Sequence, residues 1–89
     1  SPAAPSPAAP RPEKPARFTF REQKEYAEIE GVIASKEGEL KVVQRQMVMN
    51  AADYSRLAEL TREEARLTAE LDALMERWTY LEGIAETMK

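Results

Sequence analysis

From Tyr26 onward, apolar residues recur along the chain at alternating intervals of three and four positions. This heptad spacing is typical of helices that pack through a narrow apolar stripe. It predicts two long helices, over about residues 19–49 and 54–86. The first stripe, in which Lys36 takes one position, consists of Tyr26, Ile29, Ile33, Leu40, Val43 and Met47. The second, in which Glu64 takes one position, consists of Leu57, Leu60, Leu67, Leu71, Leu74, Trp78 and Leu81.

Short motifs mark where the first helix begins and where the chain turns back. Residues 19–22 read Thr-Phe-Arg-Glu, and a T-x-x-E sequence forms a capping box at a helix start. Residues 50–53 read Asn-Ala-Ala-Asp, in which Asp53 is a candidate cap for the second helix. No proline follows Pro15. We therefore expect an all-α fold, a two-helix antiparallel coiled-coil hairpin with its tip at about residues 50–53.

The two stripes also predict a register. If the chain folds back at residue 50, each apolar position meets one on the other helix, and the hairpin is roughly 45 Å long. Lys36 then lies opposite Glu64. We expect these two to form a partly buried ion pair that fixes the register, and two independent side chains reaching for water are the alternative. The expected apolar pairs are Leu40 with Leu60, Val43 with Leu57, Ile33 with Leu67, Ile29 with Leu71, and Tyr26 with Leu74.

Residues 17–26, RFTFREQKEY, place two aromatic rings among basic residues at the start of the first helix. A two-helix hairpin buries little core, so its open end needs a closing contact. The register brings this stretch near Trp78 and Leu81. We expect Phe18, Phe20 and Trp78 to form an aromatic end cap, and stacking of the rings on nucleic-acid bases is the alternative.

The first sixteen residues have a different composition. They hold all six prolines and five alanines, and they offer almost nothing to bury. Such a segment favours an extended tether. We expect residues 1–16 to be a disordered Pro/Ala-rich linker before a single domain at residues 17–89, and a PxxP ligand is the alternative. The first residue is not methionine, so we interpret the chain as part of a longer protein.

Several chemistries are excluded by composition. The chain has no cysteine and no histidine, which rules out disulfides, the usual zinc ligands and Ser-His or Cys-His nucleophile pairs. It has no apolar run of the roughly 20 residues that span a bilayer, and no phosphate-binding G-x-x-x-x-G-K loop. We expect no catalytic residue, no metal site and no cofactor in this chain, and no contact with a membrane.

The net charge of −3 conceals an uneven distribution. Residues 1–24 hold five basic and two acidic residues, and residues 41–62 hold four basic residues against Asp53 and Glu59. Basic clusters at the two ends of a hairpin are candidate contacts to nucleic-acid phosphates. For each basic residue, a solvated helix face is the alternative. The candidate nucleic-acid-binding residues are Arg11, Lys14, Arg17, Arg21, Lys24, Lys41, Arg45, Arg56 and Arg62.

A Pro/Ala-rich linker, then FTFREQKEYAEIEGVI, then ERWTYLEG, resembles the C-terminal domain of Uup-type ABC-F ATPases. That domain starts with a pattern like K-E-Q-R-E and ends with one like R-W-E-E-L-E. The resemblance covers residues 17–83. Two positions depart from the family, which often has proline at Glu30 and an apolar residue at Lys36.

The resemblance implies a parent protein with two ATP-binding cassettes that bind ATP and Mg, no membrane domain and a cytoplasmic location. It also implies that the hairpin is a non-catalytic arm that binds the phosphate backbone of nucleic acid without strong sequence specificity. DNA is the expected ligand, and ribosomal RNA is the other candidate. A spacer arm that docks on a protein or on the ribosome is the alternative.

We expect the chain to be a monomer. Weak self-association through exposed Val32, Val42, Val48 and Met75 is the alternative.

Overall fold

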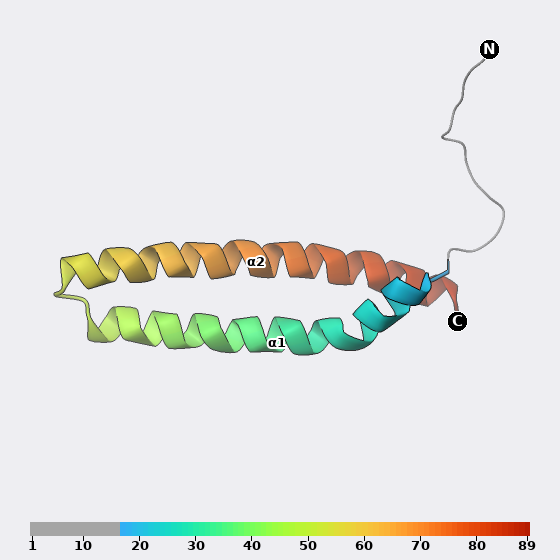
Figure 1. The fold of residues 1–89 in the computed structure, drawn as a ribbon, viewed down its shortest axis with the longest axis horizontal. Coiled ribbons are helices and arrows are strands. Elements are labelled where there is room, and N and C mark those ends of the chain that lie inside the picture. The colour runs from blue at the N-terminus through green and yellow to red at the C-terminus, as the bar shows by residue number, and fades with distance from the viewer. Residues whose placement is uncertain (1–16) are drawn as a thin grey trace, which may run out of the picture.

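The computed structural model describes residues 17–89, and it consists of two long helices packed side by side (Figure 1). Helix α1 spans Phe20–Met49 and helix α2 spans Tyr54–Thr87, and no strand occurs within residues 17–89. The helices run in opposite directions. The predicted two-helix antiparallel hairpin is therefore confirmed, with bounds close to those expected. The linker predicted for residues 1–16 lies outside the described part of the chain.

Side chains close the helix ends as the motifs predicted. The hydroxyl of Thr19 accepts a hydrogen bond from the backbone N–H of Glu22 at 3.0 Å, and the Glu22 carboxylate accepts one from the Thr19 N–H at 3.0 Å. Asp53 caps α2 in the same way by accepting from the N–H of Arg56 at 3.1 Å. At the end of α1, both the backbone N–H and the side-chain amide of Asn50 donate to the carbonyl of Gln46. The connection between the helices is therefore only four residues long, Asn50 to Asp53.

The hydrophobic core consists of two clusters along the interface between the helices. The cluster nearer the tip contains buried Val43, Leu60 and Leu67, with Leu40 and Met47 packed against it. The cluster nearer the open end contains buried Ile29, Ile33 and Leu81, against which Phe18, Tyr26, Leu71, Leu74 and Trp78 pack. Between the clusters, Lys36 of α1 forms an ion pair with Glu70 of α2, with 2.8 Å between Nζ and Oε1.

The predicted register is wrong by several residues, because Lys36 pairs with Glu70 and not with Glu64. Glu64 instead accepts a hydrogen bond from the side-chain amide of Gln44 at 3.2 Å. Among the predicted apolar pairs, Ile33 and Leu67 are separated, since Leu67 shares a cluster with Val43. The members of the predicted pairs Leu40–Leu60, Ile29–Leu71 and Tyr26–Leu74 each lie in one cluster.

Two physical effects account for the shift in register. The turn is centred between residues 51 and 52, later than the assumed fold at residue 50. In addition, each helical side chain leans toward the N-terminus of its own helix, so it covers a spot about one position before its Cα. In an antiparallel pair, the two leans add. Both effects move the partner of an α1 residue further along α2.

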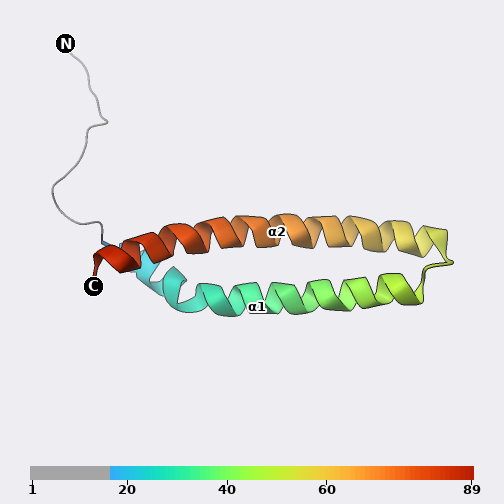
Figure 2. The ribbon, with the colours of Figure 1, turned by 180° about the vertical axis from the view of Figure 1, so that it is seen from behind.

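The open end is closed by a bend in α1. The first turns of α1 leave the line of the rest of the helix and cross the last turns of α2, as the front and back views both show (Figures 1 and 2). Phe18 and Trp78 pack against the same apolar cluster, as predicted. The Phe18 ring lies 5.1 Å from that of Tyr26, between ring centroids.

The prediction is wrong for Phe20, whose surface is 86% exposed. Phe20 is the first residue of α1 and stands nine positions before buried Ile29. Nine residues are two and a half helical turns, so its side chain starts on the opposite face of the helix.

Candidate nucleic-acid interface

Seven of the nine predicted nucleic-acid-binding residues belong to the described part of the chain, where they lie toward the two ends of the hairpin and most are not engaged by carboxylates. Arg56 is the exception, since its guanidinium lies 3.1 Å from Glu59. Arg11 and Lys14 fall outside the described residues. The other six are exposed and form no ion pair within residues 17–89, namely Arg17, Arg21, Lys24, Lys41, Arg45 and Arg62.

The basic residues of the middle of the hairpin are paired instead. Arg66 lies between Glu63 and Glu70 on the same helix, with 2.8 Å from its Nη1 to the Glu70 carboxylate. The hydrogen bond from Lys36 and the charge of Arg66 hold the pKa of Glu70 below its usual value. The two carboxylates raise the pKa of Arg66. This Lys36–Glu70–Arg66–Glu63 network leaves no basic group free there for an anionic ligand.

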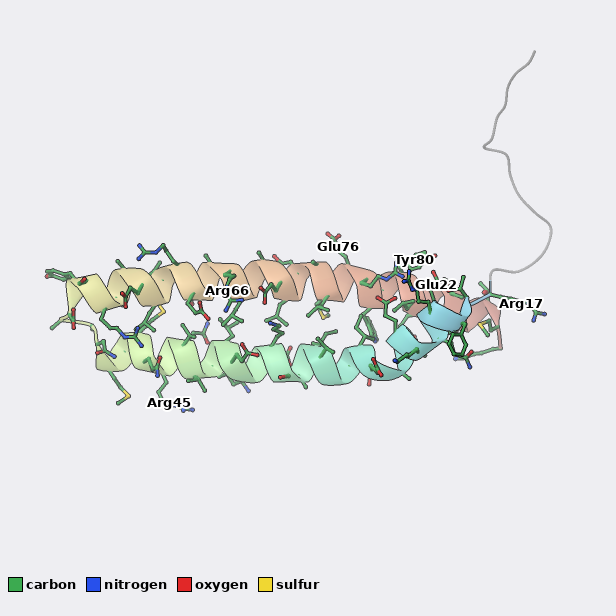
Figure 3. All side chains as sticks on the ribbon, in the orientation of Figure 1. Arg17, Glu22, Arg45, Arg66, Glu76 and Tyr80 are labelled. Atoms are coloured by element: carbon green, nitrogen blue, oxygen red, sulfur yellow. The ribbon has the colours of Figure 1, made fainter. Side chains whose placement is uncertain are left out.

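The open end carries a second polar network, which sequence reasoning missed. The guanidinium of Arg77 on α2 donates to both oxygens of Glu25 on α1, at 2.7 and 2.8 Å, and lies 3.8 Å from Glu22. Its carbon atom Cζ also lies 4.8 Å from the centre of the Tyr80 ring. The Tyr80 hydroxyl donates to Glu22 at 3.1 Å, and the two side chains lie close together in Figure 3. These contacts depend on which turns of the two helices meet, so a single helix pattern gave no signal for them.

Hydrogen bonds and charge shift several pKa values in this network. The Thr19 backbone amide lowers the pKa of Glu22, and the Arg77 guanidinium lowers that of Glu25. The Tyr26 hydroxyl donates to Glu82 at 2.7 Å, and this bond to a carboxylate raises the pKa of Tyr26. These interactions therefore favour the charged form of the Glu22 and Glu25 carboxylates. The two carboxylates lie beside the exposed cations of the same end and oppose them.

The charge at the open end cancels, whereas the charge at the tip does not. Near the open end, three basic and two acidic residues of positions 17–25 meet two basic and three acidic residues of positions 76–89. At the tip, residues 41–62 keep four basic residues against two acidic ones. Arg45 points away from α2, into solvent (Figure 3). The tip is therefore the more basic end of the folded hairpin.

The tip also exposes apolar side chains. Val48 is 78% exposed, Met49 75% and Tyr54 82%, and all three flank the turn. Scattered exposed apolar residues are common, but a group at the end of a long arm is typical of an interaction surface.

No other chemistry is apparent in the part of the chain that the structure describes. Within residues 17–89, no group of three or more acidic side chains is placed to hold a metal ion. Neither of the two helices described is long and apolar enough to cross a membrane.

Comparison with known proteins identifies the class to which this hairpin belongs. The sequence model of the ABC transporter C-terminal domain matches residues 17–83, which is nearly the whole described structure. The chain therefore belongs to the ABC transporter C-terminal domain family. A relative in Bacillus subtilis (strain 168), the uncharacterized ABC transporter ATP-binding protein YfmR, is 30% identical over 73 residues. The match covers 82% of this chain but only 12% of the relative. No solved structure matches the chain significantly.

Proposed function

We propose that this domain is the non-catalytic C-terminal arm of a cytoplasmic ABC-F ATPase of the Uup type. In that protein, ATP and Mg would bind to the cassettes and not to the hairpin. We further propose that the tip of the hairpin binds the phosphate backbone of nucleic acid, with DNA as the first ligand to test and ribosomal RNA as the second.

One observation carries the proposal. Within residues 17–89, the cations without a carboxylate partner lie toward the ends of the hairpin, and residues 41–62 at the tip hold four basic residues against two acidic ones. Lys41 and Arg45 lie on α1 and Arg62 lies on α2, so both helices carry exposed cations near the tip. Arg and Lys contacts of this kind position a protein on nucleic acid without reading its sequence. We therefore expect weak, salt-sensitive binding without sequence preference.

A specific observation favours a second function. The turn exposes the apolar side chains of Val48, Met49 and Tyr54. Contacts to a nucleic-acid phosphate would not use these side chains. A spacer arm that docks its tip on a protein, or on a protein surface of the ribosome, would bury these side chains. In that case the three exposed cations would tune the docking, and the arm would bind no nucleic acid directly.

An amide-shift titration of the isotope-labelled chain separates these functions. The ligands are a short DNA duplex and a ribosomal RNA hairpin, each at low and moderate salt. We expect shifts around residues 41–62 that weaken as salt rises, because each neutralised phosphate releases counterions. A preference for one ligand identifies the nucleic acid. An absence of shifts at low salt with both ligands would contradict nucleic-acid binding and support the docking arm.

Two matched triple variants show which end binds. Replacing Lys41, Arg45 and Arg62 with glutamine should abolish most of the binding. The plot of log affinity against log salt concentration has a negative slope, and the variant should make it shallower by roughly 2 to 3. Replacing Arg17, Arg21 and Lys24 with glutamine removes the same charge at the open end and should have a small effect. The reverse order would move the interface to the open end.

A further inference from the structure

A groove between the helices near the open end has no role in the proposed function. Its volume is about 230 Å³, large enough for a single long side chain. The apolar surface comes from both helices, and two glutamates stand on the α1 side. Its lining residues are Glu30, Ile33, Ala34, Glu37, Met75 and Trp78.

The two carboxylates of this groove have no cationic partner in the described part of the chain. Glu37 forms no ion pair with any residue of 17–89. Glu30 accepts a hydrogen bond from Nε1 of Trp78 at 3.4 Å, which holds the indole ring at the groove. The face of an aromatic ring attracts a cation, and two carboxylates beside the ring add the attraction of their negative charges.

The chain already contains a filled site with the same chemistry. Arg77 pairs with Glu25, lies 3.8 Å from Glu22, and places its guanidinium 4.8 Å from the centre of the Tyr80 ring. That site therefore combines two glutamates, one aromatic ring and one arginine. The groove offers two glutamates and the aromatic ring of Trp78, and within residues 17–89 it lacks the arginine.

We propose that this groove binds an arginine side chain of a partner protein. The aliphatic stem would lie along Ile33 and Met75, and the guanidinium would meet Trp78 and Glu37. Arginine fits better than lysine, because its planar group stacks on a ring and bonds a carboxylate through two donors. The site is independent of nucleic-acid binding at the tip, since its acidic groups repel phosphate. The arm would thus hold a basic protein segment near its base.

The single tryptophan of the chain gives a direct readout, because Trp78 has the only indole N–H signal in a proton–nitrogen spectrum. The probe is the capped tripeptide Gly-Arg-Gly, titrated into the full chain. We expect a saturable shift of the Trp78 signal with a dissociation constant in the millimolar range. The capped peptide Gly-citrulline-Gly has nearly the same shape without the charge, and it should produce no saturable shift. Gly-Lys-Gly should bind more weakly than Gly-Arg-Gly.

Matched variants test the groove itself. Glu37→Gln should weaken binding of the arginine peptide about three- to fivefold. Glu76→Gln removes the same charge from an exposed side chain that points away from α1 (Figure 3), and should leave binding unchanged. Equal effects of both variants, or equal binding of the citrulline peptide, would overturn the proposal.

Two further outcomes would also overturn a partner protein as the occupant. If the Trp78 signal shifts on dilution without peptide, a second copy of the chain fills the groove. If a chain reduced to residues 17–89 binds the peptide much more tightly than the full chain, the chain's own first residues compete for the groove. Unchanged binding in both comparisons supports a partner protein.

Discussion

The ammonium group of Lys36 on α1 lies 2.8 Å from a carboxylate oxygen of Glu70 on α2, at the point where the two apolar clusters meet. This contact is the one direct ion pair between the helices in the middle of the described hairpin. Because the helices interact through a single apolar seam, a polar pair at a fixed height discriminates between alternative registers.

Glu70→Gln should lower the melting temperature, because it leaves Lys36 partly buried and without its charged partner. We expect a decrease of a few degrees, measured by circular dichroism at neutral pH. Glu64→Gln is the matched control and should cause a smaller change, since Glu64 forms no ion pair within residues 17–89 and accepts a hydrogen bond from the neutral side chain of Gln44. A larger effect of Glu64→Gln would restore the register predicted from the sequence. The double variant Lys36→Leu, Glu70→Leu should recover most of the loss.

Acid should destabilise the hairpin. The pKa values of Glu22, Glu25 and Glu70 are held below the ordinary value of 4.5 by hydrogen bonds from Thr19, Arg77 and Lys36, respectively. Folded carboxylates with lowered pKa values stabilise the fold above the unfolded pKa, and this contribution is lost as pH falls through the folded pKa. The melting temperature should therefore fall as pH is lowered from about 5 toward 3.

Glu25→Gln provides the control for this pH dependence. The variant cannot lose the Arg77 contact by protonation, so its melting temperature should change less over the same pH range. It should also start from a lower value at neutral pH. A pH profile parallel to that of the unmodified chain would exclude Glu25 as a source of the acid sensitivity.

Leu67→Ala should remove a large part of the stability of the fold. Leu67 is fully buried in the cluster nearer the tip, and deleting such a side chain costs about 2–5 kcal/mol. Val48→Ala is the control, because Val48 is mostly exposed and should cost no more than about 0.5 kcal/mol. Urea unfolding followed by circular dichroism measures both values. Similar losses in the two variants would contradict the assignment of the core.

Replacing the glycines of α1 with alanine should stabilise the hairpin. A methyl group added at Gly31 or Gly38 would meet no atom within 4 Å apart from its own local helix. Since alanine favours helix over glycine by about 0.8–1.0 kcal/mol, each change should raise the free energy of unfolding by about that amount. The double variant should gain nearly the sum, measured by urea unfolding. A loss of stability would indicate a close contact at this face.

The local structure of this chain followed from its sequence. Thr19, Glu22 and Asp53 cap the helices where their motifs predicted, because capping involves atoms only a few residues apart. The heptad pattern predicted which face of each helix is buried, and Ile29, Ile33, Val43, Leu60 and Leu67 are indeed among the buried residues. That pattern repeats every seven residues. It therefore specifies the buried face of each helix but not the register, that is, which residues of the two helices lie opposite each other.

The tertiary structure decided the register between the two helices. The length of the turn and the lean of the side chains place Lys36 against Glu70, and the bend of α1 brings Arg77 to Glu25 while Phe20 stays in solvent. It also decided the balance of charge, because acidic residues at the end of α2 offset the basic start of α1, whereas residues 41–62 at the tip keep two more basic than acidic residues. The sequence thus determined two capped amphipathic helices that pair, since those properties are local. The three-dimensional path of both helices determined which side chains meet. It also determined the positions of the groove and of the basic tip.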